Sequence, residues 1–404
     1  MTPLLRRTFF MMALLPGLAF GGSMHYTSLV MFGDSVTDIG NSFAAAGAPD
    51  STWYPQGRFL DDAGNDGVGD SYGEVLWRAL NLPGELTASA LGGTNFAFGG
   101  ARSRYGSQDV SQPGREPPTA GTPSQGNPSF GSFLWQLDTY LSATGAVADP
   151  FALYMVMIGG NDVGDIAAEF GRGDTANANA LFAQSVADVV SGVVDLVVAG
   201  ARNVAVASVP NLGITPEARA LDAVAPGTAA LLRGLSLSYN NTLAAGLDVA
   251  LGLVGDLDFW FLDTYALVDE ILADPGRFGL VNTTDACLVG FFVDGPDGSG
   301  IPPALCTDPT TFGFYDRVHP SSTVHAVLAE RFYAAVPAPM PLVLLSFLLP
   351  AMLLRRQRHR RRPRNRPPRA WRDVWLKRGN PPHTKEYAGL RCRPAFLGDA
   401  DLAS

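Results

Sequence analysis

The chain has 404 residues, of which 47% are hydrophobic and only 17% charged, so it can bury a large core in one or two domains. Its net charge of −9 is unevenly distributed: the segment from Arg355 to the end has 15 Lys and Arg against 4 Asp and Glu, whereas the preceding residues have 14 against 34. The excess of acidic residues before Arg355 argues against nucleic-acid binding, because phosphate recognition needs clustered Lys and Arg.

The N-terminus has the pattern of a secretory signal. Arg6 and Arg7 precede an uncharged, mostly apolar run over 8–20, and Ala19-Phe20-Gly21 supplies small residues for cleavage. We expect a signal peptide over residues 1–22 and an exported protein, either extracellular or in the cell envelope. The alternative is a buried first helix or an anchor, although the run is short for a membrane span.

Four short apolar runs predict buried parallel strands: 28–32, 151–158, 203–208 and 257–262. Helical patterns lie between or after them, at 71–80, 133–143, 177–199, 228–253 and 322–335. This alternation predicts a parallel sheet with helices on both faces. Functional residues gather at the carboxyl ends of such strands, where Ser35 and Asn161 are found. The Gly-, Pro- and Ser-rich segment 106–128 is typical of a surface loop.

Cys287 and Cys306 flank a Gly-, Pro- and Asp-rich loop, and an exported protein meets oxidising conditions. We therefore expect a disulfide between them, which would contribute ~3 kcal/mol by the loop-entropy estimate. The alternative is two reduced, buried thiols. The third cysteine, Cys392, lies in the tail, and three cysteines give no metal-site spacing.

The character of the chain changes after Val336. Residues 336–339 (VPAP) lead into an uncharged apolar stretch over 340–354, and nine arginines follow over 355–369. This arrangement resembles the PEP-CTERM sorting signals of bacterial envelope proteins, except that Ala338 stands where those signals have Glu. The resemblance implies recognition by an exosortase and removal of the tail; the alternative is a membrane anchor through 340–354. Residues 370–404 show no periodic pattern, and we expect them to be disordered.

Histidine is scarce, which narrows the choice of a catalytic base. Three of the five histidines lie beside the expected cleavage site or in the basic tail: His25, His359 and His383. Of the remaining two, only His319 has a carboxylate three residues before it, Asp316. We expect His325 to be an ordinary helix residue, with a role behind the site as the alternative.

Ser35 follows the first predicted strand within Gly33-Asp34-Ser35. A serine needs a base within hydrogen-bond reach, and an imidazole needs a carboxylate to fix its tautomer. We therefore expect Ser35 as nucleophile, His319 as base and Asp316 as orienting acid. Metal binding by Asp316, His319 and His325 is a weaker alternative, and no cofactor is expected.

A tetrahedral intermediate also needs donors for its oxyanion. The candidates are the N–H of Ser35, an N–H from Gly99 or Gly100, and the side-chain amide of Asn161. Each fragment alone has a structural explanation as a turn, a helix entry or a strand exit. Their combination in this order is what points to a catalytic site.

Residues 32–41 (FGDSVTDIGN) resemble the first motif block of the GDSL, or SGNH, hydrolases. The segments 95–101 (NFAFGGA), 159–162 (GGND) and 314–320 (FYDRVHP) resemble the second, third and fifth blocks. The cysteine loop and the helix that follows His319 resemble the secreted phospholipase/lecithinase/haemolysin branch. The likeness covers most of a single expected domain over residues 26–336.

The resemblance implies a flavodoxin-like α/β fold, a three-layer α/β/α sandwich with a parallel five-stranded sheet. It implies metal-independent hydrolysis of carboxylic esters through an acyl-enzyme, with Ser35, Asp316 and His319 as the triad. It also implies an oxyanion hole from Ser35, Gly100 and Asn161. Gly99 stays possible, because two adjacent glycines leave the alignment ambiguous.

The expected function is an exported serine esterase or lipase that acts on small-molecule or lipid acyl esters. The same acyl-enzyme can pass its acyl group to an alcohol, which leaves an acyltransferase as an alternative. A non-catalytic surface binding protein is a third. Its signature would be the loss of Ser35, His319 or Asn161, and all three are present.

Overall fold

The computed structural model describes residues 26–47, 49–50, 52–61, 69–104, 130–293 and 295–336. Contacts divide the chain into two units, Met1–Val343 and Leu344–Ser404, and every described residue belongs to the first. The expected signal peptide, the loop 106–128, the segment 337–369 and the tail therefore lie outside the described residues.

Four parallel strands form the central sheet in the order β1-β2-β3-β4. Their bounds are Leu29–Gly33 (β1), Leu153–Met157 (β2), Asn203–Ala207 (β3) and Asp258–Leu262 (β4). Each coincides closely with an apolar run in the sequence. The first three strands are buried along their whole length, as continuous apolar runs predict for a sheet covered on both faces.

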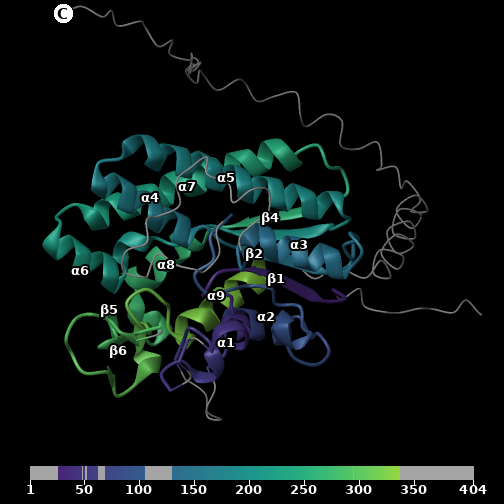
Figure 1. Cartoon of the computed structure of the whole chain (residues 1–404). Coiled ribbons are helices and arrows are strands. Elements are labelled where there is room, and N and C mark those ends of the chain that lie inside the picture. The colour runs from purple at the N-terminus through teal and green to yellow at the C-terminus, as the bar shows by residue number, and fades with distance from the viewer. Residues whose placement is uncertain are drawn as a thin grey trace, which may run out of the picture. The chain divides into compact units, whose positions relative to one another are not determined.

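Helices cover both faces of the sheet and give the expected α/β/α layers (Figure 1). One layer contains α3 (Phe133–Ala143), α4 (Gly160–Arg172), α5 (Thr175–Val198) and α7 (Thr228–Leu251). The other contains α2 (Tyr72–Ala79), α8 (Thr264–Ala273) and α9 (Ser322–Ala335). The shorter helices are α1 (Asn41–Ala46) and α6 (Pro216–Val224).

Alternate strand residues point into two separate cores. Val30 and Phe32 of β1 pack with α3 and α5 in one core, whereas Leu29 and Met31 pack with α2 and α9 in the other. Phe32 is fully buried, and burial of such a side chain contributes ~1.5–3 kcal/mol. The two cores together fix the sheet between its helical layers.

The expected five-stranded sheet is corrected in one respect: four strands are regular, and an irregular segment takes the fifth place. Segment 94–98 runs beside β1, where the Phe96 N–H donates to the Met31 carbonyl at 2.7 Å and the Phe98 N–H to the Gly33 carbonyl at 3.2 Å. The side-chain amide of Asn41 donates to carbonyls of this segment, so a side chain replaces a further strand at its edge. β1 therefore lies at the switch point of the sheet, where such folds place sites.

α5 is long and apolar enough, by length and composition alone, to cross a membrane. Half of its most apolar window is buried inside the domain, and its side chains Val189 and Val193 belong to the first core. Its apolar character is explained by packing against the sheet. The expected membrane segment, 340–354, lies outside the described residues.

A small lobe of short strands precedes α9. The parallel pair β5 (Asn282–Ala286) and β10 (Phe312–Phe314) borders two antiparallel pairs, β6 (Leu288–Val289) with β9 (Ala304–Leu305) and β7 (Phe291–Phe292) with β8 (Gly295–Pro296). A disulfide joins Cys287 to Cys306, the pair that the sequence indicated. It closes the segment that lies directly before the Asp316–His319 turn.

Candidate active site

Ser35 lies in a tight turn that follows β1 directly. A Cβ on Gly33, at the end of the strand, would lie 2.6 Å from the Met157 carbonyl oxygen, so only glycine fits there. The Asp34 carbonyl accepts a hydrogen bond from the Asp38 N–H at 2.9 Å, which closes the turn. The turn holds the partly buried Ser35 side chain at the carboxyl edge of the sheet.

Asp316 and His319 share the turn between β10 and α9. Asp316 Oδ1 accepts hydrogen bonds from the N–H groups of Val318 and His319, at 2.9 and 2.8 Å. Asp316 Oδ2 lies 2.6 Å from His319 Nδ1. Ser321 caps the following helix, accepting a bond from the Val324 N–H. These contacts fix the imidazole ring so that Nε2 points away from the carboxylate.

His319 Nε2 lies 2.8 Å from Ser35 Oγ, although 284 positions separate the two residues in the chain. When Nδ1 carries the ring proton and donates it to Asp316, Nε2 is free to accept the hydroxyl proton of Ser35. The structure thus brings together three residues that the sequence singled out, in the order hydroxyl, imidazole, carboxylate. Such an arrangement can take the proton from a serine as it attacks.

Asp316 is fully buried, with 0% of its surface exposed. Burial alone would raise the pKa of its carboxyl group, but the facing His319 ring and the backbone N–H donors hold that pKa below its ordinary value. The Tyr54 hydroxyl donates a further hydrogen bond to Oδ2 at 2.9 Å. The carboxylate is therefore ionised at neutral pH and can stabilise positive charge on the imidazole.

Asn161 and the double glycine follow the two segments that neighbour β1, namely β2 and residues 94–98. Asn161 lies at the start of α4, and its Nδ2 donates to the Ala101 carbonyl at 2.9 Å, leaving a second N–H on the same nitrogen. Gly99 uses its N–H to bond Asp38 at 2.9 Å, which makes Gly100 the better oxyanion candidate of the two glycines. Ser35 and Asn161 line one cavity, whereas Gly100 is not among the residues that line it.

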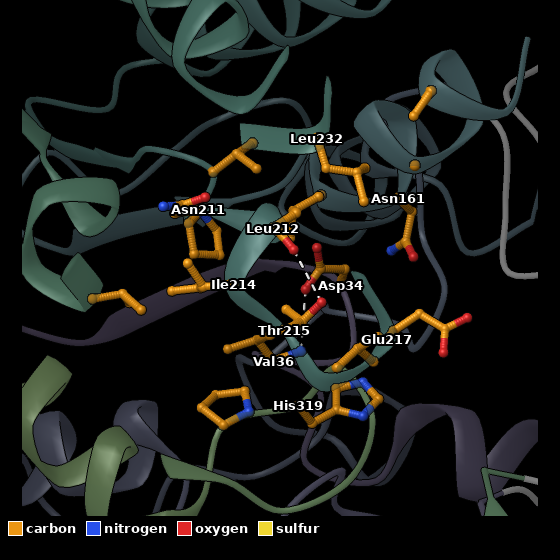
Figure 2. Close-up of a pocket in the computed structure, with 18 of the residues that line it drawn as sticks. Asp34, Val36, Asn161, Asn211, Leu212, Ile214, Thr215, Glu217, Leu232 and His319 are labelled. Carbon is orange, nitrogen blue, oxygen red and sulfur yellow. Dashed lines mark hydrogen bonds between the residues drawn. The ribbon is translucent and has the colours of Figure 1, made fainter. Parts of the chain in front are cut away.

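That cavity has a volume of about 660 Å³, and Ser35 and His319 are among the residues that line it. Figure 2 shows Asp34 between His319 on one side and the apolar side chains Leu212 and Leu232 on the other. The volume is in the range of small-molecule sites, ~300–1,000 Å³. A serine with a paired imidazole therefore faces a space large enough for an organic substrate.

Residues 29–332 match the family described as GDSL-like Lipase/Acylhydrolase. The chain belongs to this family. An uncharacterized protein from the trpE-trpG intergenic region of Pseudomonas putida is 30% identical over 366 residues, which are 85% of this chain and 54% of that protein. Esterase EstA of Pseudomonas aeruginosa is 30% identical over 347 residues, which are 79% and 48%.

A GDSL esterase/lipase of Arabidopsis thaliana is 26% identical over 351 residues, which are 78% of this chain and 88% of that protein. The chain spans about half the length of the two bacterial relatives. Membership in the GDSL family agrees with the observed α/β/α layers and with ester hydrolysis as the general chemistry of the family.

Within this GDSL-family fold, one residue that the sequence did not single out supports the Ser35 turn. Gln136 of α3 accepts from the Gly33 N–H at 2.9 Å and donates to the Gly33 carbonyl at 2.8 Å, so its amide pairs with both backbone groups. Asp34 is buried beside Ser35, and burial raises the pKa of its carboxyl group to about 6. No local pattern marks Gln136, because its partner lies 103 residues earlier.

A buried ion pair fixes the loop after the double glycine. The Arg102 guanidinium binds both carboxylate oxygens of Asp165, at 2.8 and 3.0 Å, and donates to the Gly100 carbonyl at 2.7 Å. Both side chains are nearly inaccessible to solvent. The pair therefore holds the Gly100 peptide in a defined position relative to α4.

His325 is a buried residue of α9, where its Nδ1 accepts from the Tyr72 N–H at 3.0 Å. Its ring stacks on the Tyr72 ring, with the ring centroids 6.0 Å apart. Among the described residues, no three His, Cys, Asp or Glu side chains are grouped so that they could hold a metal ion. The Nδ1 atoms of His319 and His325 are thus both engaged with protein partners.

Proposed function

We propose that this GDSL-family protein is a serine-dependent carboxylic ester hydrolase that works through an acyl-enzyme. The observation that carries the proposal is the chain of two short contacts, 2.8 Å from Ser35 Oγ to His319 Nε2 and 2.6 Å from His319 Nδ1 to Asp316 Oδ2. The family match and the esterases among the relatives support the reaction class.

In the first half-reaction, Ser35 Oγ attacks the ester carbonyl carbon while its proton passes to His319 Nε2. Asp316 stabilises the imidazolium that forms. The carbonyl oxygen becomes an oxyanion, for which the N–H groups of Ser35 and Gly100 and the Asn161 amide are the proposed donors. When the intermediate collapses, the bond to the alcohol oxygen breaks and His319 gives that oxygen its proton.

In the second half-reaction, His319 takes a proton from a water molecule that attacks the acyl carbon. The new oxyanion uses the same donors. Its collapse releases the carboxylic acid, and the proton on His319 returns to Ser35 Oγ. Each proton transfer is balanced, so the site needs no further reactant than ester and water.

The replacement Ser35→Ala tests the proposal. We expect it to lower kcat for p-nitrophenyl butyrate by at least ~10³-fold, as for other triad serines. Ser191→Ala, which removes an exposed serine hydroxyl on α5, is the control and should keep wild-type activity. Near wild-type turnover by Ser35→Ala, in a variant with an unchanged unfolding midpoint, would refute the assignment.

We also propose that the protein is exported. The pattern over residues 1–22 and the Cys287–Cys306 disulfide support this location, because disulfides persist in oxidising compartments. Processing of the C-terminal segment by an exosortase rests on the sequence pattern alone. Mass spectrometry of the mature protein tests both cleavages: termini near residues 22 and 337 are expected, and intact termini would contradict them.

A further inference from the structure

The cavity beside Ser35 continues along the carboxyl edge of the sheet. The four strand ends lie in register there, because Gly33 pairs with Met157, Met157 with Ala207, and Ala207 with Leu262. The residues that line the cavity include one just beyond each strand: Ser35, Gly160, Pro210 and Thr264. The cavity therefore forms a groove that runs from the end of β1 to the end of β4.

The length of this groove follows from strand spacing. Adjacent strands lie ~4.8 Å apart, so three spacings give a groove of roughly 14 Å. An extended chain of tetrahedral atoms advances ~1.2 Å per bond, since a residue with three backbone bonds spans ~3.5 Å. An extended alkyl chain of roughly twelve carbons thus fits between β1 and β4.

α4 forms one wall of the groove with very small residues. Gly164, Ala168 and Gly171 lie three or four residues apart, on one face of the helix, and all three line the cavity. A Cβ placed on Gly164 or Gly171 would meet no atom within 4 Å. Larger side chains at these two positions would therefore project into open groove rather than into packed protein.

The remaining walls are mainly apolar. Figure 2 shows Leu212 and Leu232 above Asp34 and Ile214 to its left. Toward the end of β4 the lining residues include Val268 and Ile271 of α8. Polar side chains also line the cavity, among them Asn211, Thr215 and Thr264, but the apolar residues predominate and favour a hydrocarbon chain.

Two ion pairs account for four of the charged side chains close to the reacting groups. Glu217 of α6 lines the cavity and is bound by the Arg317 guanidinium, with Nε at 2.6 Å from the carboxylate. Arg102 and Asp165, which also line it, bind each other. These charges are neutralised by protein partners, so they do not offer a site for an ionic headgroup.

We propose that this groove binds the acyl chain of a medium-chain aliphatic ester, of about eight to twelve carbons, and that Gly164 and Gly171 determine the chain length that fits. This inference rests on the proposed function. The leaving alcohol oxygen must face His319 Nε2 to collect its proton. The acyl chain then extends past Asn161 along the strand ends, and the alcohol lies on the histidine side.

The test is a series of p-nitrophenyl esters, from acetate to palmitate, with the wild-type protein, Gly164→Leu and Gly171→Leu. We expect the wild-type kcat/KM to peak between octanoate and dodecanoate. Each leucine should lower kcat/KM for decanoate by at least about ten-fold, the discrimination expected when a few methylene groups lose their space. Turnover of acetate should change less than about two-fold.

Gly234→Leu is the matched control. Gly234 is an exposed helix glycine of α7 that meets no atom within 4 Å of its added Cβ and does not line the cavity. Because leucine is a better helix former than glycine, none of these variants should lose its fold. Gly164→Ala should lower kcat/KM for decanoate by a smaller factor than Gly164→Leu. Decyl acetate has its long chain on the alcohol, so its kcat/KM should not change in the leucine variants.

Three results would overturn the inference while the proposed function stands. In the first, the wild-type kcat/KM is highest for acetate. In the second, the leucine variants lower kcat/KM equally for all esters. In the third, only the kcat/KM for decyl acetate falls, which would place the alcohol in the groove. Absence of turnover for every ester in the series, or full activity of Ser35→Ala, would instead overturn the proposed function itself.

Discussion

The Tyr54 hydroxyl donates a hydrogen bond to Asp316 Oδ2 at 2.9 Å, and both side chains are completely buried. The same hydroxyl accepts a bond from the Val293 N–H at 3.0 Å. Val293 lies between Cys287 and Cys306, so Tyr54 connects the proposed orienting carboxylate to the disulfide-closed segment. The tyrosine is thus placed to act on catalysis through Asp316.

Replacement of Tyr54 by Phe should lower kcat/KM about ten-fold or more, because a hydrogen bond to a charged group contributes ~1.5–3 kcal/mol. The loss should fall on kcat, with KM unchanged, because Tyr54 acts through Asp316. Tyr315→Phe is the control, since the Tyr315 hydroxyl donates to the Trp53 carbonyl instead. Equal losses in the two variants, or a loss carried by KM rather than kcat, would show that Tyr54 only supports the fold.

Asp316→Asn should lower kcat by ~10³–10⁴-fold with little change in KM. An asparagine can present its amide N–H to His319 Nδ1 and so hold the imidazole in the tautomer that cannot accept the Ser35 proton. Asp285→Asn, at an exposed carboxylate of β5, provides the comparison. Steady-state kinetics on a short p-nitrophenyl ester measures both; a loss of less than about ten-fold would remove Asp316 from the mechanism.

Removal of the disulfide should affect stability and activity together. Replacing both Cys287 and Cys306 by Ala removes a constraint on a 19-residue separation, at a cost of ~3 kcal/mol in the free energy of unfolding. Activity should fall as well, because Phe292 in this segment stacks on His319 with ring centroids 6.1 Å apart. Urea unfolding and kcat are the measurements. If the double variant has an unchanged kcat under conditions where it is fully folded, the proposal that this segment supports His319 is contradicted.

His325 should make the fold sensitive to acid. Burial lowers its pKa from 6.5 to about 3, so the unfolded chain binds more protons between those values. The contribution of His325 to stability is therefore complete above pH 6.5 and is lost as pH falls toward 3, by up to ~1.4 kcal/mol per pH unit. Asp34, whose pKa burial raises from 3.8 to about 6, acts in the opposite direction between those values.

A His325→Asn variant separates these two effects. Asparagine does not titrate and keeps an acceptor for the Tyr72 N–H, which His325 binds at 3.0 Å. As the pH falls from 7 to 4, the wild-type free energy of unfolding should fall relative to that of the variant. Urea unfolding at several pH values measures the difference. Parallel curves would mean that His325 has the same pKa in the folded and unfolded states, which would contradict the lowered pKa.

The strands and the segments that carry Ser35, Asp316 and His319 were predictable because local patterns mark them. A mostly apolar run marks each strand, and Gly33-Asp34-Ser35 and Asp316-Arg317-Val318-His319 are short segments that each carry their own chemistry. Parallel topology then places Ser35 at the carboxyl edge. The proximity of Ser35 and His319 followed from their chemistry and the family resemblance, not from any spacing along the chain.

Elements whose formation depends on tertiary contacts were not predictable. α4 begins with Gly160 after another glycine and has no hydrophobic residue in its first three positions, and it forms because Val163 and Ile166 are buried. Segment 94–98 departs from a regular strand because the Asn41 side-chain amide donates hydrogen bonds to its Asn95 and Ala97 carbonyls, where a further strand would otherwise pair. Tyr54 and Gln136 reach the site across long stretches of sequence, so no short motif identifies them.

Covalent labelling with a fluorophosphonate tests the central claim most directly, because the reagent reacts with a serine only when a base activates it. We expect one adduct per folded wild-type chain, mapped by peptide mass spectrometry to Ser35, and labelling at least ~10²-fold slower in His319→Ala. An adduct on another residue, or no adduct in a preparation that hydrolyses esters, would contradict the account.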